Sequence, residues 1–407
     1  MAVPARRLRL VLANQAEVGN HRYHVFPCVP PRALSSTKVE TRPLAKQRKS
    51  KARSFARRLG TPRRVVSTAS QRAGPVLVTG GAGFIGSHLV ERLLHNGQSV
   101  IVMDDCSTGT LDNLRAVAGH PALKVIVSKI SEHKDLGGLL SGVQTIYHLA
   151  AAVGVELVVR SPLRVMKTNL QETEVLLEAA APYRVPVLLT STSEVYGKSQ
   201  ETEFDEEDDL FIGGPSHARW SYACSKLMNE FLALGYARER SLPVVIARLF
   251  NTVGPRQTGR YGMVMPRFIS AAVEGKPLRV YGDGSQTRCF CHVKDTVEAL
   301  VRLQNCAAAR HEIFNVGSTE EISIQHLAEQ IILLLRSKSP IEKVSYQVAY
   351  DAGFEDVPRR KPATDKLARF TGFRPATPLQ AIIEQTAAGM WRSGNGPLPE
   401  MAFTEAG

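Results

Sequence analysis

The sequence predicts an α/β protein with a doubly wound parallel sheet and a smaller mixed α/β domain. Two observations lead to this prediction. From residue 75 onwards, short apolar runs of strand length alternate with segments of helical periodicity, which is typical of parallel strands joined by helices. A glycine-rich turn also joins the first apolar run to the first helical segment, as in Rossmann-type folds.

The predicted strands of the main sheet are continuous apolar runs, as expected of parallel strands that are buried on both faces. They cover residues 76–78, 99–104, 124–127, 145–149, 185–189 and 244–248. A helix follows the first strand, because apolar residues recur at helical spacing until Gly97. Another helix is expected around residues 170–181.

After residue 250 the predicted elements become shorter and mixed. Helices are expected at 264–274, 295–305 and 323–336, and a strand at 278–281. The last helix begins at Thr377-Pro378, since proline is favoured in a first helical turn, and ends near Trp391. We expect residues 75–250 to form mainly the dinucleotide-binding domain and 251–392 mainly the substrate domain. The chain of the substrate domain also returns to the main sheet, and 393–407 form a loose tail.

The net positive charge of the chain comes from its N-terminal extension. The protein has 51 Lys and Arg against 38 Asp and Glu, and residues 1–74 contain 17 of the basic residues but 2 of the acidic ones. This composition predicts disorder in residues 1–74. Three interpretations stay open: an organelle transit peptide, a tether to nucleic acid or another anionic surface, or an inert leader. We favour the inert leader, because the domain pattern begins at Pro75 and needs nothing before it.

Several other classes of protein are disfavoured by the sequence. No apolar stretch approaches the roughly 18 residues that a membrane helix needs. The six cysteines show no paired spacing for a metal and follow no secretory signal, so we expect no metal site and a cytoplasmic location. Organelle targeting by the extension remains an alternative.

The glycine turn predicts a dinucleotide site. Gly80, Gly83 and Gly86 lie between strand and helix, where missing side chains let a pyrophosphate approach the backbone amides of the turn, with Phe84 and Ile85 in the same segment. Asp104, at the end of the second strand, can bind the ribose hydroxyls. Its charge would repel a 2′-phosphate, so NAD is favoured over NADP.

Tyr222 and Lys226 are four residues apart, so on a helix they share one face. A phenol with a pKa of about 10 is a poor base at neutral pH. A neighbouring ammonium lowers such a pKa, so we expect Lys226 to bring the pKa of Tyr222 toward neutrality.

These motifs carry a family resemblance. Residues 76 to about 391 resemble the extended short-chain dehydrogenase/reductases of the NAD-dependent epimerase/dehydratase family, which modify nucleotide sugars. The matching motifs are TGGAGFIG, HLAA, STSEVYG, YACSK, RLFNTVGPR and YGDGSQTR, in that order. The resemblance implies that Thr192, Tyr222 and Lys226 form a catalytic triad for oxidation of the sugar at C4 by NAD, and that Tyr222 and Lys226 also bind the cofactor. It also implies a homodimer that is joined through two helices per subunit.

Within this family the closest motifs are those of UDP-glucuronate decarboxylases and UDP-apiose/UDP-xylose synthase. Ser193-Glu194, the segment around Arg219 and the run 359–362 carry this likeness. It implies decarboxylation of UDP-glucuronate to UDP-xylose, because oxidation at C4 makes a β-keto acid that readily loses carbon dioxide. Arg360 would hold or protonate the enolate, and Glu194 would position groups or transfer a proton.

Alternatives remain within and outside this family. Glu194 also lies where 4,6-dehydratases place a base, and the loop 258–264 suits a 4-epimerase. Among the binding residues, the resemblance places Asn251 and Arg288 on the nucleotide diphosphate and sugar, and Ser193 and Arg219 beside them. Arg256 is interpreted as structural. Lys129 stands where the family usually has an acid near the adenine, which is a departure.

A different class of function is a non-catalytic NAD-binding protein with a nucleic-acid-binding arm. The complete triad argues against this alternative.

Overall fold

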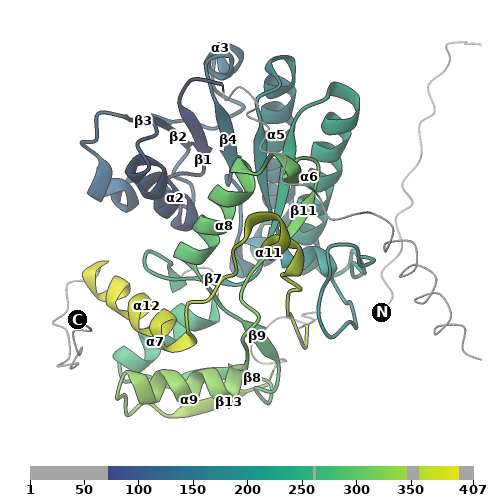
Figure 1. The fold of residues 1–407 in the computed structure, drawn as a ribbon. Coiled ribbons are helices and arrows are strands. Elements are labelled where there is room, and N and C mark those ends of the chain that lie inside the picture. The colour runs from purple at the N-terminus through teal and green to yellow at the C-terminus, as the bar shows by residue number, and fades with distance from the viewer. Residues whose placement is uncertain (1–71, 260–262, 346–356, 394–407) are drawn as a thin grey trace, which may run out of the picture. The chain divides into compact units, whose positions relative to one another are not determined.

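The computed structural model describes residues 72–393 except for 260–262 and 346–356 (Figure 1). The predicted basic extension up to residue 71 and the tail from residue 394 therefore lie outside the described residues. Within the described ranges, no helix is long and apolar enough to cross a membrane.

The main sheet has seven parallel strands, and the residues of its central strands alternate between two buried faces, whereas the edge strand β3 is partly exposed. Its order is β11-β6-β5-β4-β1-β2-β3, so the chain reverses direction across the sheet between β1 and β4, as in a Rossmann-type fold. The predicted fold class is confirmed. The strands are β1 (Val76–Thr79), β2 (Val100–Asp104), β3 (Leu123–Val127), β4 (Thr145–His148), β5 (Val187–Thr192), β6 (Val244–Leu249) and β11 (Ile313–Val316).

Helices pack on both faces of this sheet. Val76 and Val78 of β1 belong to the core beneath α2, α8 and α11, whereas Leu77 faces the core beneath α3, α5 and α6. This alternation follows from the period of two along a strand. The helices are α2 (Phe84–His95), α8 (Val293–Asn305), α11 (Asp365–Thr371), α3 (Leu136–Ser141), α5 (Pro162–Ala180) and α6 (Arg219–Arg240).

The helix that was predicted at 170–181 begins earlier than expected. It is α5, which starts at Pro162 and follows the short unpredicted helix α4 (Val155–Arg160). Proline fits the first helical turn because its missing N–H has no partner there. The apolar spacing that predicted α5 is clear only in its second half.

A second layer lies at the carboxyl ends of the strands and has its own apolar core (Figure 1). Among the described residues, three helices and three short strand pairs form it. These elements are α7 (Val264–Val273), α9 (Ile324–Leu334), α12 (Leu379–Ser393), β8 (Leu278–Tyr281) with β13 (Ile341–Val344), β9 (Thr287–Cys289) with β12 (Glu321–Ser323), and β7 (Thr252–Val253) with β10 (Cys291–His292). As predicted, the chain returns to the main sheet, through α8, β11 and α11.

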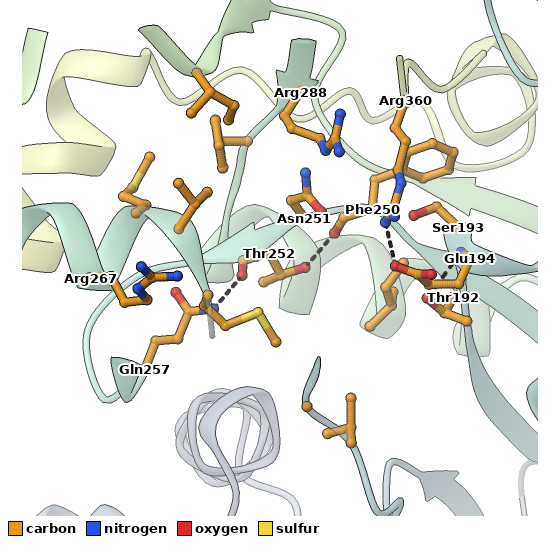
Figure 2. Close-up of a pocket in the computed structure, with 18 of the residues that line it drawn as sticks. Thr192, Ser193, Glu194, Phe250, Asn251, Thr252, Gln257, Arg267, Arg288 and Arg360 are labelled. Carbon is orange, nitrogen blue, oxygen red and sulfur yellow. Dashed lines mark hydrogen bonds and ion pairs between the residues drawn. The ribbon is translucent and has the colours of Figure 1, made fainter. Parts of the chain in front are cut away.

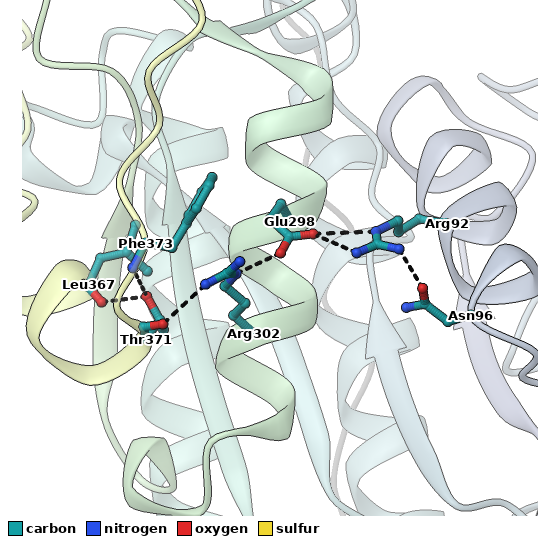
Figure 3. A network of polar contacts seen from close by, with 7 residues as sticks. All are labelled: Arg92, Asn96, Glu298, Arg302, Leu367, Thr371 and Phe373. Carbon is teal, nitrogen blue, oxygen red and sulfur yellow. Dashed lines mark hydrogen bonds and ion pairs between the residues drawn. The ribbon is translucent and has the colours of Figure 1, made fainter.

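A polar network fastens the returning helices to the first half of the chain (Figure 3). Glu298 of α8 accepts hydrogen bonds from Arg92 of α2 at 3.0 Å and from Arg302 of α8 at 2.6 Å. Arg302 also donates to the backbone carbonyl of Thr371 at the end of α11, at 3.4 Å. Because these side chains are partly exposed, the network adds little to the free energy of folding, and it mainly fixes how α8 is oriented relative to α2 and α11.

Candidate active site at the carboxyl ends of the strands

Two connected cavities lie where the main sheet meets the second layer. The first, of about 330 Å³, is lined by the glycine turn, Asp104 and the segment after β4. The second, of about 310 Å³, is lined by Thr192, Tyr222 and residues of the second layer. The change of chain direction between β1 and β4 opens the first cavity, which is where ligands bind in such sheets.

The glycine turn needs its glycines for close packing. Gly80 has a positive φ of 72°, and a Cβ there would lie 2.7 Å from the backbone nitrogen of Ala150. A Cβ on Gly86 would lie 2.0 Å from the carbonyl oxygen of Gly80. Helix α2 therefore starts directly against the turn, and its first residues line the first cavity, with their free amides available to an anion.

Asp104 connects the end of β2 to the glycine turn. Its carboxylate accepts hydrogen bonds from the amides of Ala82 at 2.9 Å and Cys106 at 2.8 Å. Burial raises the pKa of Asp104, and these two amides oppose that rise. Each oxygen keeps a further lone pair for a ligand hydroxyl at the cavity wall. Lys129, the predicted departure, lies at the edge of the same cavity and pairs with Glu132 at 2.5 Å.

The structure brings Thr192 and Tyr222 together but corrects the expected effect of Lys226. Thr192 ends β5, and its side chain hydrogen-bonds the Tyr222 hydroxyl. Burial raises the pKa of Tyr222, the Glu194 carboxylate raises it further, and only the Thr192 bond lowers it. The expectation that Lys226 brings this pKa toward neutrality is therefore wrong, since the pKa is raised and Lys226 is not among the groups that shift it.

Lys226 is buried deeper, and its own pKa is perturbed. Burial lowers the pKa of its ammonium from 10.5 to about 8, while the charge of Glu230 opposes this change. Its charge acts on His148, whose pKa falls to about 3 through burial and then through Lys226. Lys226 thus lies on the same helix face as Tyr222, but its electrostatic partners are the buried His148 and Glu230 and not Tyr222.

His148 anchors the segment that lines the first cavity, a role that sequence patterns did not single out. Its ring nitrogens lie 2.8 Å from the Thr79 hydroxyl and 3.0 Å from the Thr173 hydroxyl. Thr173 donates its own proton to the Asn169 carbonyl, so His148 Nε2 carries the hydrogen and Nδ1 accepts from Thr79. Asn169 in turn binds the backbone of Ala152 through both of its amide atoms. The imidazole is therefore neutral and structural.

Glu194 lies in a cluster of arginines (Figure 2). Its two oxygens lie 2.5 Å from Arg360 and 3.5 Å from Arg219. Burial raises the pKa of this carboxyl, but the charges of Arg360, Arg219 and Arg288 outweigh burial, so the pKa is lowered. Glu194 is therefore ionised at neutral pH. Such a group orients guanidinium groups and is poorly suited to donate a proton.

The second cavity is strongly basic. Among the described residues, its lining contains one carboxylate, Glu194, and five arginines, which are Arg219, Arg267, Arg279, Arg288 and Arg360. Asn251 lines it as well. Sequence reasoning found Arg219, Arg288, Arg360 and Asn251 but missed Arg267 and Tyr281. Arg267 donates to the Tyr281 hydroxyl at 2.5 Å and lies 4.8 Å from the ring centre.

A buried ion pair supports the triad from behind. Glu230, one helical turn after Lys226, accepts from Arg248 of β6 at 2.8 and 3.1 Å. It also accepts from the hydroxyl of Ser191, the neighbour of Thr192, at 2.5 Å. Glu230 therefore links α6 to both strands that end at the second cavity. In the part of the chain that the structure describes, no group of His, Cys, Asp and Glu is arranged to hold a metal.

Comparisons with known proteins agree with this architecture. The model of the NAD dependent epimerase/dehydratase family matches residues 76–317. The UDP-N-acetyl-alpha-D-glucosaminuronate decarboxylase of Bacillus cytotoxicus is 40% identical over 311 residues, which are 76% of this chain and 95% of that protein. UDP-glucuronic acid decarboxylase 6 of Arabidopsis thaliana is 36% identical over 308 residues, which are 75% of this chain and 85% of that protein.

A solved structure is similar in fold as well. The crystal structure of UDP-glucuronic acid 4-epimerase from Bacillus cereus, in complex with UDP-glucuronic acid and NAD, superposes with a TM-score of 0.72 at 26% identity. The match covers 79% of this chain and 100% of the epimerase chain.

Proposed function

Because this chain belongs to the NAD dependent epimerase/dehydratase family, we propose that it decarboxylates a UDP-hexuronate, with UDP-glucuronate converted to UDP-xylose. The observation that carries this proposal is the five arginines with one ionised carboxylate in the second cavity. A UDP-hexuronate has a charged diphosphate and a carboxylate, and guanidinium groups suit both. Two relatives named as UDP-uronate decarboxylases support the same choice.

The first cavity fits NAD. The open amides of α2 suit a pyrophosphate, and Asp104 suits a ribose without a 2′-phosphate. Leu249 lines both cavities and is the register partner of Thr192, so a nicotinamide ring at this junction would lie near a sugar beside Thr192. When bound there, NAD supplies a hydride acceptor that later returns the hydride, so the overall reaction is redox-neutral.

Tyr222 and Thr192 are assigned to the C4 oxygen of the sugar. Tyr222 exchanges the proton of the C4 hydroxyl, and Thr192 hydrogen-bonds the same oxygen. Tyr222 is protonated at neutral pH, because burial and Glu194 raise its pKa. Its phenol is therefore suited to donate a proton when the C4 hydroxyl is formed again. To accept a proton it must first be a phenolate, which requires that positive charge on a bound ligand lowers its pKa.

Arg360 and Glu194 are assigned to the uronate end. The 4-keto acid loses carbon dioxide when its C5–C6 bond breaks and the electron pair moves into an enolate. A proton taken up from solvent at C5 then gives the 4-keto pentose, and return of the hydride to C4 with a proton on its oxygen gives the UDP-pentose product. Arg360 is placed to stabilise the carboxylate and then the enolate, and Glu194 holds the guanidinium in position from 2.5 Å. Because Glu194 is ionised, we assign it positioning and not proton donation.

Proton NMR of the purified protein with NAD and UDP-glucuronate tests the proposal. The expected product is a UDP-pentose with new C5 methylene protons. A hexuronate altered only at C4 would instead indicate a 4-epimerase, and reaction only with UDP-glucose or GDP-mannose would indicate a 4-epimerase or 4,6-dehydratase that acts on neutral sugars. Arg360→Met is expected to lose decarboxylation, while Arg374→Met, which removes an exposed pair with Asp365, serves as the control.

We also propose that the protein is a homodimer joined through α5 and α6. These neighbouring helices leave large apolar side chains exposed: Leu163 at 63%, Met228 at 50% and Phe231 at 65%. A second copy that covers these side chains would remove them from water.

A further inference from the structure

The junction between the two cavities has a polar atom for which the described residues supply no hydrogen-bond partner. Five described residues line both cavities, namely Val153, Leu249, Thr252, Gln257 and Met263. Three of them are apolar. Any hydrogen bond from the side chains of this junction to a ligand must therefore come from Thr252 or Gln257.

Thr252 is already satisfied by its surroundings. Its hydroxyl donates to the Phe250 carbonyl at 3.1 Å and lies 3.1 Å from the Thr296 hydroxyl. The Thr252 carbonyl accepts from Gln257 Nε2 at 3.0 Å, which fixes the orientation of the Gln257 amide (Figure 2). Gln257 remains as the polar group with capacity to spare.

The amide oxygen of Gln257 is buried, and no described residue donates to it. A buried acceptor without a donor is unfavourable, because water that once solvated it has been removed. The amide also cannot turn to relieve this without losing the Thr252 bond. The oxygen lies beside two cavities, so its lack of a donor is explained if a ligand in one of them donates a hydrogen bond to it.

The turn that carries Gln257 is fixed before any ligand binds. The Gln257 amide nitrogen donates to the Gly254 carbonyl at 3.3 Å. Arg256 donates to Ser87 at 3.1 Å and pairs with Glu91, so the turn is fastened to α2. His88 of the same helix lies 3.0 Å from the Pro255 carbonyl. A ligand would therefore bind Gln257 at little cost in ordering the turn.

We propose that Gln257 is a ligand-binding residue whose amide oxygen accepts a hydrogen bond from a hydroxyl or amide N–H at the junction of the two cavities. Because the Gln257 oxygen can only accept, ionised phosphate and carboxylate oxygens, which are acceptors as well, cannot be its partners. Hydroxyl and amide donors occur in both a dinucleotide and a nucleotide sugar, so either ligand is a source of this chemistry. The inference rests on the proposed function, which assigns these two ligands to the cavities.

Separate binding measurements on the full chain test the inference and distinguish the two sources. Isothermal titration calorimetry with NADH alone and with UDP-glucuronate alone compares the wild type with Gln257→Leu. The control is Gln380→Leu, which removes an exposed glutamine that bonds Glu384 at 2.9 Å on α12. We expect Gln257→Leu to weaken one ligand by about three- to tenfold, the effect of one neutral hydrogen bond. Weaker NADH binding identifies the dinucleotide as the donor, and weaker UDP-glucuronate binding identifies the sugar nucleotide.

Thermal unfolding without ligands provides a second measurement. Gln257→Leu removes an unpartnered buried oxygen but also the hydrogen bond from Nε2 to the Thr252 carbonyl, so the two effects oppose each other and we expect the variant to remain folded with an unfolding temperature close to that of the wild type. A folded variant that binds both ligands like the wild type overturns the assignment of Gln257 alone. A wild type that binds neither ligand overturns the proposed function and this assignment with it.

Discussion

Replacing Lys226 with methionine is expected to stabilise the protein while abolishing turnover. Lys226 is buried, with 3% of its surface exposed, and burial lowers its pKa from 10.5 to about 8. Its charged form is therefore less favourable in the folded protein than in the unfolded chain. Methionine has a similar length, is apolar and removes this cost. We expect turnover to be lost because the family resemblance assigns Lys226 to the catalytic triad.

The size and sign of the effect follow from proton linkage. The unfolded chain binds more protons between pH 8 and 10.5, so the contribution of Lys226 to stability rises with pH across this window. Below pH 8 the full cost, about 3 kcal/mol, is present. We therefore expect the variant to exceed the wild type by about 3 kcal/mol in free energy of unfolding at pH 7, and by about 1 kcal/mol at pH 9.5.

Urea unfolding at both pH values, with an activity assay on the same samples, checks this prediction. Lys276→Met is a matched control, because Lys276 is exposed and pairs only at the surface with Glu274 at 2.6 Å. The control should change stability by less than about 0.5 kcal/mol at either pH. A variant that is less stable than the wild type at pH 7, or a gap that does not shrink as the pH rises, would refute the reasoning.

Three further predictions concern single substitutions. Tyr222→Phe is expected to lose at least about 100-fold in turnover and keep NADH binding, because only the hydroxyl beside Thr192 is removed; retained turnover in the NMR assay would contradict its role. Glu230→Ala is expected to lower the free energy of unfolding by about 3–5 kcal/mol, since Arg248 stays buried without its carboxylate; a urea midpoint like that of the wild type would show otherwise. Phe231→Glu is expected to turn the proposed dimer into a monomer by placing charge on the apolar face of α6; sedimentation velocity measures this, and a wild type that is already monomeric would refute the dimer.

Much of the fold could be predicted because its signals are local. The apolar runs of β1 and β2, the glycine turn and the spacing of α2 each occupy a few consecutive residues. The start of α5 and all of α4 were missed, because these segments carry no clear helical periodicity. The roles of the basic extension and the tail stay predictions, since they lie outside the described residues.

Within the site, the sequence by itself determined which chemical groups are present and their order along the chain. It placed Thr192 at a strand end, Tyr222 and Lys226 on one helix face, and the glycines between strand and helix, because short spacing fixes these relations. The tertiary structure alone decided how the groups act. Burial and the charge of Glu194 raise the pKa of Tyr222, and Glu194 stays ionised because folding brings Arg360 within 2.5 Å of it.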